Sequence, residues 1–123
     1  YFSLEEGVDG GNVKIQQNGG SWMTIPTTAF LYNTYSDILP QPGFTDNPLA
    51  GQRVFSGADE GAVTGSWGTS QVDLTVIGVQ PGETIRLRWE LGTDGCNGWD
   101  GWYLDNVNVG TCAARILQCR FLH

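Results

Sequence analysis

The chain has 123 residues, of which 6 are basic and 13 are acidic, so its formal net charge is −7. This charge argues against nucleic-acid binding, because a phosphate backbone requires a basic surface. No apolar run approaches the roughly 20 residues that cross a bilayer, so we expect no membrane span. No secretory leader is present, and we expect a mature product or an excised piece. The acidity suits calcium, or simply solubility.

The first half of the chain predicts a short hairpin followed by a long loop. Residues 12–15 have the composition of a strand. Asn18 and Gly19 both tolerate positive φ, which favours a tight turn, and the return strand would carry Trp22. Residues 40–51 contain three prolines and two glycines, so we expect an irregular loop on the surface.

The second half predicts further strands separated by turns. Residues 72–76 alternate between apolar and polar, and residues 80–83 (Gln-Pro-Gly-Glu) favour a turn. Residues 85–91 alternate strictly, with apolar side chains on one face and charged ones on the other, as in a half-buried antiparallel strand. Residues 92–109 begin as a glycine-rich loop and end as a strand. Many short strands with turns between them predict an all-β sandwich or barrel.

One acidic residue on the last predicted strand raises the question of a cation. Asp105 shares a strand face with Val107 and Val109, so it points inward if the valines face the core. An ionised carboxylate there needs a cation or several donors. Calcium is coordinated by carboxylate and carbonyl oxygens, which glycine-rich loops present well, and Asp94 lies in such a loop. Alternatively, Asp105 pairs with an arginine or accepts hydrogen bonds from backbone N–H groups.

Three cysteines cannot all pair within one molecule. We expect a disulfide between Cys96 and Cys112, with Cys119 left over, and the alternative is that all three are free. The disulfide, the single lysine and the high glycine and tryptophan content favour a secreted or cell-surface protein. The composition changes after Cys112, so residues 113–123 are expected to be an atypical tail or linker outside the domain formed by residues 1–112.

Exposed tryptophan suggests a second class of binding site, because flat aromatic rings stack on sugar rings. Trp99 lies between Gly98 and Asp100 in a loop and is the best candidate, whereas the other four tryptophans are expected to fill the core. A carbohydrate-binding module that uses Trp99 and Asp100 is therefore the alternative function. Paired acids such as Asp94, Asp100 and Asp105 carry no distinguishing catalytic signature, and the common enzyme motifs are missing. We expect no catalytic residue.

Five segments form an ordered pattern along the chain. They are residues 6–13 (EGVDGGNV), 18–22 (NGGSW), 66–74 (SWGTSQVDL), 86–89 (RLRW), and 92–94 (GTD) with 101–107 (GWYLDNV). In this order they resemble the MAM-like accessory domain of secreted bacterial proteins, in the form attached to immune-inhibitor-A-type metallopeptidases.

The resemblance implies a jelly-roll-like antiparallel β-sandwich that is non-catalytic and secreted or exposed on the cell surface. It implies a role in adhesion or substrate targeting, with a protein or glycan at the cell surface as partner. It also implies a structural calcium site, to which Glu6, Asp9 and Asp105 would contribute; Asp94 completes the candidate set. The family commonly has a second acid where this chain has Asn106, which lowers the local charge.

The family's domain begins with strands upstream of residues 6–13, and residues 1–4 look like the tail of such a strand. A domain without its first strands would expose a sheet edge, and exposed edges pair with other chains. We therefore expect a homodimer through an exposed sheet edge.

Overall fold

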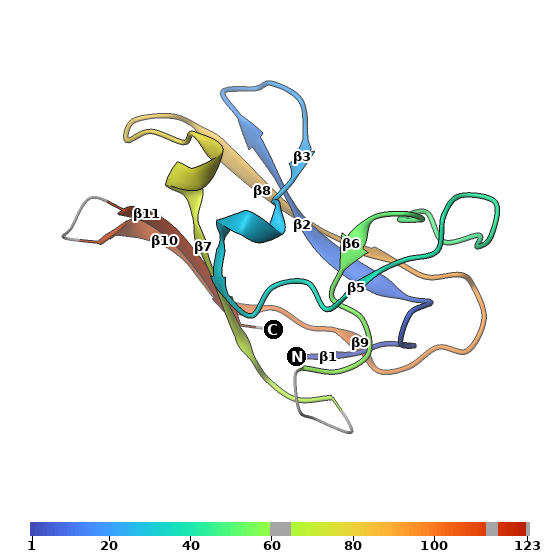
Figure 1. Ribbon diagram of the computed structural model, residues 1–123. Helices are drawn as coiled ribbons and strands as arrows, with labels where there is room; N and C mark the ends of the chain where they lie inside the picture. The colour runs from blue at the N-terminus through green and yellow to red at the C-terminus, as the bar shows by residue number, and fades with distance from the viewer. Residues whose placement is uncertain (60–64, 113–115, 123) are drawn as a thin grey trace.

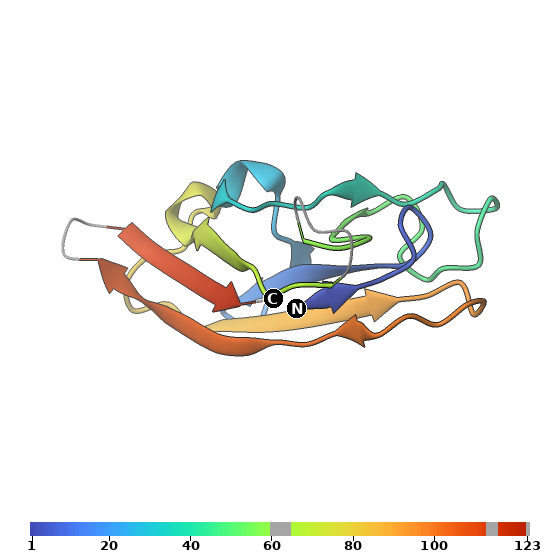
Figure 2. The same cartoon turned by 90° about the horizontal axis from the view of Figure 1, so that it is seen from below.

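Strands dominate the computed structural model, which describes residues 1–59, 65–112 and 116–122, with only the backbone at residues 112, 116–119 and 122. The predicted fold class, an all-β antiparallel sandwich, is confirmed (Figures 1 and 2). No helix within the described ranges has the length and hydropathy of a membrane span. The strands are β1 (Phe2–Ser3), β2 (Gly10–Gln17), β3 (Met23–Thr24), β4 (Phe30–Tyr32), β5 (Asp37–Ile38), β6 (Arg53–Val54), β7 (Thr69–Asp73), β8 (Ile85–Gly92), β9 (Gly101–Trp102), β10 (Asp105–Cys112) and β11 (Ile116–Leu122), with short 3-10 helices η1 (Thr27–Ala29) and η2 (Leu74–Ile77).

Two antiparallel sheets face each other. One has the strand order β3-β2-β8, and the other has the order β10-β11-β7-β4. The ring of Trp89 on β8 meets the ring of Phe121 on β11 edge to face, with centroids 5.8 Å apart. The edge strand β8 therefore packs against β11, and β10, the next strand of the second sheet, extends past the edge of the first. Exposures of 44% at Val107 and 49% at Val109 agree with this overhang.

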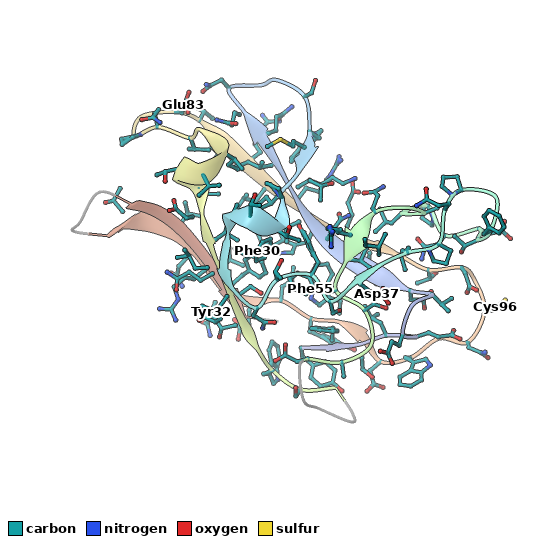
Figure 3. The ribbon with its side chains drawn as sticks, in the orientation of Figure 1. Phe30, Tyr32, Asp37, Phe55, Glu83 and Cys96 are labelled. Carbon is teal, nitrogen blue, oxygen red and sulfur yellow. The ribbon has the colours of Figure 1, made fainter. Side chains whose placement is uncertain are left out.

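Phe55 is the centre of the core, although it lies outside the regular strands. Its side chain is 1% exposed, and Figure 3 shows it in the interior beside Phe30. Burial of a phenylalanine ring is worth roughly 1.5–3 kcal/mol, and favourable ring–ring geometry adds to this. Five aromatic rings have their centroids between 5.0 and 6.5 Å from that of Phe55: Phe2, Phe30, Tyr35, Trp102 and Phe121.

Glycine at position 11 allows this aromatic core to form against β2. The backbone of Gly11 exchanges two hydrogen bonds with Phe55, at 2.7 and 2.9 Å. A Cβ atom on residue 11 would lie 2.2 Å from Cζ3 of Trp102, well inside van der Waals contact. Any side chain here would push the indole ring away from Phe55.

Both predicted turns are confirmed, and they contact each other. Asn18 and Gly19 have φ values of 49° and 74°, and Gly82 has a φ of 92° with Glu83 N–H donating to the Gln80 carbonyl at 3.2 Å. The carboxylate of Glu83 accepts hydrogen bonds from the Gln80 N–H at 2.8 Å and from Asn18 Nδ2 at 3.0 Å. These hydrogen bonds lower the pKa of Glu83, the backbone donor contributing most.

The predicted strand over residues 72–76 was wrong beyond residue 73. Asp73 Oδ1 accepts a hydrogen bond from the Thr75 N–H at 2.9 Å, which favours a tight turn over an extended chain. The helix η2 begins at Leu74, and Gly78 follows it with a φ of 86°.

Residues 116–122 also differ from the prediction, which placed them in a tail or linker. They form β11, which pairs with β10 on one side and with β7 on the other. The side chain of Phe121 is fully buried. The composition change after Cys112 therefore does not mark the end of the fold.

The two ends of the chain meet in one row of the sheet. On one side, Phe2 pairs with Trp102 and Leu122 pairs with Asp105. On the other side, Phe2 pairs with Ser66 and Leu122 pairs with Thr69. Each neighbouring segment has two residues between its two paired ends, so the spacing between Leu122 and Phe2 is the same on both sides. Strands β11 and β1 thus lie end to end (Figures 1 and 2).

The expected disulfide between Cys96 and Cys112 is not formed, because the two residues lie at opposite ends of the molecule. Cys96 is a free, exposed thiol at the tip of the loop before β9 (Figure 3). From Asp105, β10 runs away from this loop, and its eight residues span roughly 25 Å. A disulfide requires Cα atoms within about 7 Å. The side chains of Cys112 and Cys119 lie outside the described residues.

Replacing Phe121 tests whether β11 belongs to the folded core. We expect Phe121→Ala to lower the free energy of unfolding in urea by about 3–5 kcal/mol, since it removes a fully buried ring between the sheets. The neighbouring exposed Arg120→Ala is the control and should change the free energy by less than about 0.5 kcal/mol. Equal stability of the two variants would show that the segment does not contribute to the core.

Candidate functional site

Three aromatic side chains from distant parts of the chain form a cluster on the surface. The ring of Tyr1 lies 6.0 Å from that of Trp67 and 5.8 Å from that of Tyr103. Trp67 is 53% exposed and Tyr103 is 55% exposed. We call these three residues the aromatic patch. Exposed apolar surface of this kind marks interaction sites.

Hydrogen bonds to both backbone and side chain hold the aromatic patch in place. The backbones of Tyr1 and Tyr103 exchange two bonds, at 2.8 and 3.0 Å. The phenol of Tyr1 donates to Asp100 Oδ2 at 2.8 Å, and this hydrogen bond raises the pKa of the phenol. Gly65 permits close approach, since a Cβ there would lie 2.3 Å from Cζ of Tyr1. The patch is therefore a fixed surface with a carboxylate at its border.

The structure sorts the five tryptophans differently from the sequence analysis. Trp99 is 59% exposed, as predicted. Trp89 and Trp102 pack against the core, as predicted. Trp22 does not fill the core as predicted: it is half-buried and lies under the Arg88 guanidinium, 4.3 Å from the ring centroid. The prediction that Trp67 fills the core was wrong. Residues 70 and 72 are buried, so alternation places position 67 on the opposite, outer face.

The acids predicted to bind calcium fall into two groups. Asp9 is 2% exposed, and its Oδ1 accepts a hydrogen bond from the Asp94 N–H at 3.0 Å. These two residues, from opposite ends of the sequence, are brought together. Glu6 has an exposed side chain, and Asp105 is exposed and accepts a hydrogen bond from the Asn106 N–H at 2.7 Å.

The expectation that Asp105 points into the interior was wrong. Val109 lies in the same row across the sheet as the buried Val72, so the valine does face inward. However, the register of β10 shifts between Asp105 and Asn108, and Asp105 faces Leu122, two positions along β11 from the exposed Arg120. The shift places Asp105 on the outer face of the sheet. Asp105 is therefore solvated and does not need a buried cation.

The acidic turn offers only part of a cation site. Glu5 Oε2 is buried without a hydrogen-bond partner among the described residues, and the nearly buried Asp9 belongs to the same turn. These oxygens suit a hard cation. However, the described parts of the chain contain no group of three or more His, Cys, Asp or Glu residues placed to hold a metal. Calcium binding by Glu6, Asp9, Asp94 and Asp105 stays a prediction, and of these four residues a hydrogen bond joins Asp9 and Asp94.

A groove opens beside Asp94 at the loop end of the molecule. Its volume is about 330 Å³, and it lies between the 40–46 loop and the 94–96 loop. Phe44 at its border is 86% exposed. The residues that line it are Val8, Pro40, Phe44, Thr45, Asp46, Asp94 and Cys96.

The three acids considered for acid–base chemistry each have a different partner. Asp94 Oδ1 accepts from the Cys96 N–H, Asp100 accepts from the Tyr1 phenol, and Asp105 accepts from its neighbour's N–H. These bonds give each carboxylate a local structural role.

Comparisons with family models, with curated proteins and with solved structures find no match to this chain. The resemblance to a MAM-like domain therefore stays a prediction.

The amino group of Tyr1 gives the patch a pH dependence. Burial lowers its pKa to about 6, from 8.0, and the nearby Asp59 partly opposes this shift. Between these values the unfolded chain binds more protons than the folded one, so stability should rise as pH increases from 6 to 8. Urea unfolding at several pH values measures this slope. Acetylating the amino group should flatten the slope, and an unchanged slope would contradict the assignment.

Calcium binding is tested by thermal unfolding. Preferential binding to the folded chain would raise the melting temperature with calcium and lower it with chelator. Asp9→Asn should abolish the shift, whereas Asp105→Asn should leave it unchanged because Asp105 is solvated. A melting temperature that is the same with calcium and with chelator would contradict calcium binding.

Proposed function

We propose that the chain is a non-catalytic binding module of a secreted or cell-surface protein and that the aromatic patch is its binding surface. The observation that carries the proposal is the pair of half-exposed rings, Trp67 and Tyr103, fixed against Tyr1. Rings that serve only the core would be buried, as Phe55 is. Fixed, exposed aromatic side chains provide contact area at low entropic cost.

A glycan is the ligand class that suits this surface best. Sugar rings present apolar C–H faces that stack on aromatic rings, and hydroxyl groups that need acceptors. The exposed carboxylate of Asp100, which binds the Tyr1 phenol through Oδ2, supplies an acceptor at the border of the patch. Aromatic side chains with a few placed polar groups are typical of small-ligand sites.

The same proposal includes the wider role that the resemblance implies. The module would serve adhesion or substrate targeting for a larger secreted protein, with jelly-roll connectivity of the MAM-like kind. Its partners would be a glycan or protein at the cell surface and a second copy of the chain. The patch supports such roles because two of its rings are half-exposed, and the β10 edge supports them because β10 is the last strand of its sheet among the described residues.

Glycan-array binding of the purified chain tests the proposal. Trp67→Ala should weaken binding by about 2 kcal/mol, roughly thirtyfold, as removal of a central aromatic contact does. Trp99→Ala is the matched control, since Trp99 is similarly exposed but lies outside the aromatic patch, and it should bind like the parent chain. Both variants should keep the parent's melting temperature.

The reverse pattern, with binding lost in Trp99→Ala and retained in Trp67→Ala, would move the site to the 93–100 loop. Absence of glycan binding in the parent chain would overturn the glycan proposal. Turnover of a glycan or peptide by the chain would contradict the non-catalytic role.

A further inference from the structure

We propose that the free edge of β10 is a docking surface for a second copy of this chain, through antiparallel pairing of β10 with β10. The strand has eight residues and stands last in the order β10-β11-β7-β4. All of its described side chains are exposed. Its regular part, Asn108–Cys112, presents a row of backbone N–H and C=O groups to any strand that can pair with it. This inference names the edge through which the self-association in the proposed function takes place.

The inner face of β10 gives the edge an apolar component. Val109 faces residue 119 of β11, and residue 119 faces Val72 of β7, so Val109 and Val72 lie in one row across the sheet. Val72 is completely buried, whereas Val109 is 49% exposed, because β8 ends the facing sheet at the level of β11. Pairing with a further strand would shield Val109 without any change in the fold.

The other sheet edges are protected, and β10 is not. The long edge strand β8 alternates charged side chains, Arg86, Arg88 and Glu90, along its outer face. The edge strand β4 has only three residues, with a register shift between Phe30 and Tyr32. Charges, short length and irregular register are the common protections of natural edges. Strand β10 also has a register shift, between Asp105 and Asn108, but beyond it the strand is regular from Asn108 to Cys112 and carries no charged side chain. This regular half is the part of β10 that is open to pairing.

The distribution of charge makes a second copy a suitable occupant. Asp105 is the only charged residue of β10 and lies at its start. An antiparallel pair centred on Gly110 would place Val109 of each copy beside Thr111 of the other. The two Asp105 carboxylates would then be roughly 30 Å apart along the pair, well beyond the screening length of about 10 Å. Such pairing is isologous and closes as a dimer.

The first test is the mass of the parent chain in solution. Sedimentation equilibrium should show a monomer–dimer equilibrium, and the dimer should tighten with added salt because each copy carries a net charge of −7. A chain that remains monomeric up to millimolar concentration at high salt would overturn the proposal.

Charge substitutions on the two edges locate the interface. Val109→Lys should weaken the dimer by about tenfold or more, because it places two lysines on the same face at diagonal positions of the pair, within reach of each other. Leu31→Lys, on the opposite edge strand β4, adds the same charge at a residue of similar exposure (52%) and should leave the dimer unchanged. Loss of the dimer in Leu31→Lys but not in Val109→Lys would overturn the proposal.

A complementation experiment keeps the test independent of folding defects. Val109→Lys and Val109→Glu should each dimerise more weakly than the parent chain, and mixing them at a concentration where each alone is monomeric should restore dimers that contain one chain of each kind. Thr111→Lys, on the same face of β10, provides a second variant if Val109→Lys does not fold. Mixed chains that stay monomeric would contradict pairing at β10. Glycan binding by the aromatic patch is measured separately, so failure of one proposal is distinguishable from failure of the other.

Discussion

Packing of aromatic rings around Phe55 is the interaction on which the rest of the molecule depends. The ring of Phe55 contacts Phe2 and Trp102, which face each other on β1 and β9. Because side chains alternate along strands, fixing Phe2 and Trp102 inside fixes Tyr1 and Tyr103 outside. The same buried cluster that stabilises the sandwich therefore positions the rings of the aromatic patch. Core and candidate site are opposite faces of two paired strands.

Much of the fold could be predicted because its signals are local. Alternation in residues 85–91, and the turn residues at 18–19 and 80–83, were read correctly, since each needs only its own neighbours in sequence. The errors came where a contact between a side chain and the backbone, or a distant strand, decided the outcome. The side chain of Asp73 ends a strand that alternation alone would continue, and β11 is specified by its two neighbouring strands rather than by its own composition.

The candidate site was harder to predict because it depends on which parts of the two sheets overlap. Trp67 was assigned to the core on residue type, although the alternation that buries Val72 already places position 67 outside. For Asp105, strict alternation predicted the same face as Val109, but the register shift between Asp105 and Asn108 places the carboxylate on the other face, and Asn106 within that shift has a φ of 50°. The proximity of Tyr1, Trp67 and Tyr103 is a property of topology, and it becomes visible only when β1 is paired with β9.

Strands β11 and β1 lie end to end in the sheet although they come from opposite ends of the sequence. Their neighbours are bridged in the same register on both sides of the gap between Leu122 and Phe2. Residues 40–51 form a surface loop without strands, so a circularly permuted molecule opened there and sealed at the present ends would retain every pairing described above. The fold therefore needs no covalent bond between β11 and β1. Pairing of each of these strands with its neighbouring segments is enough to define the architecture.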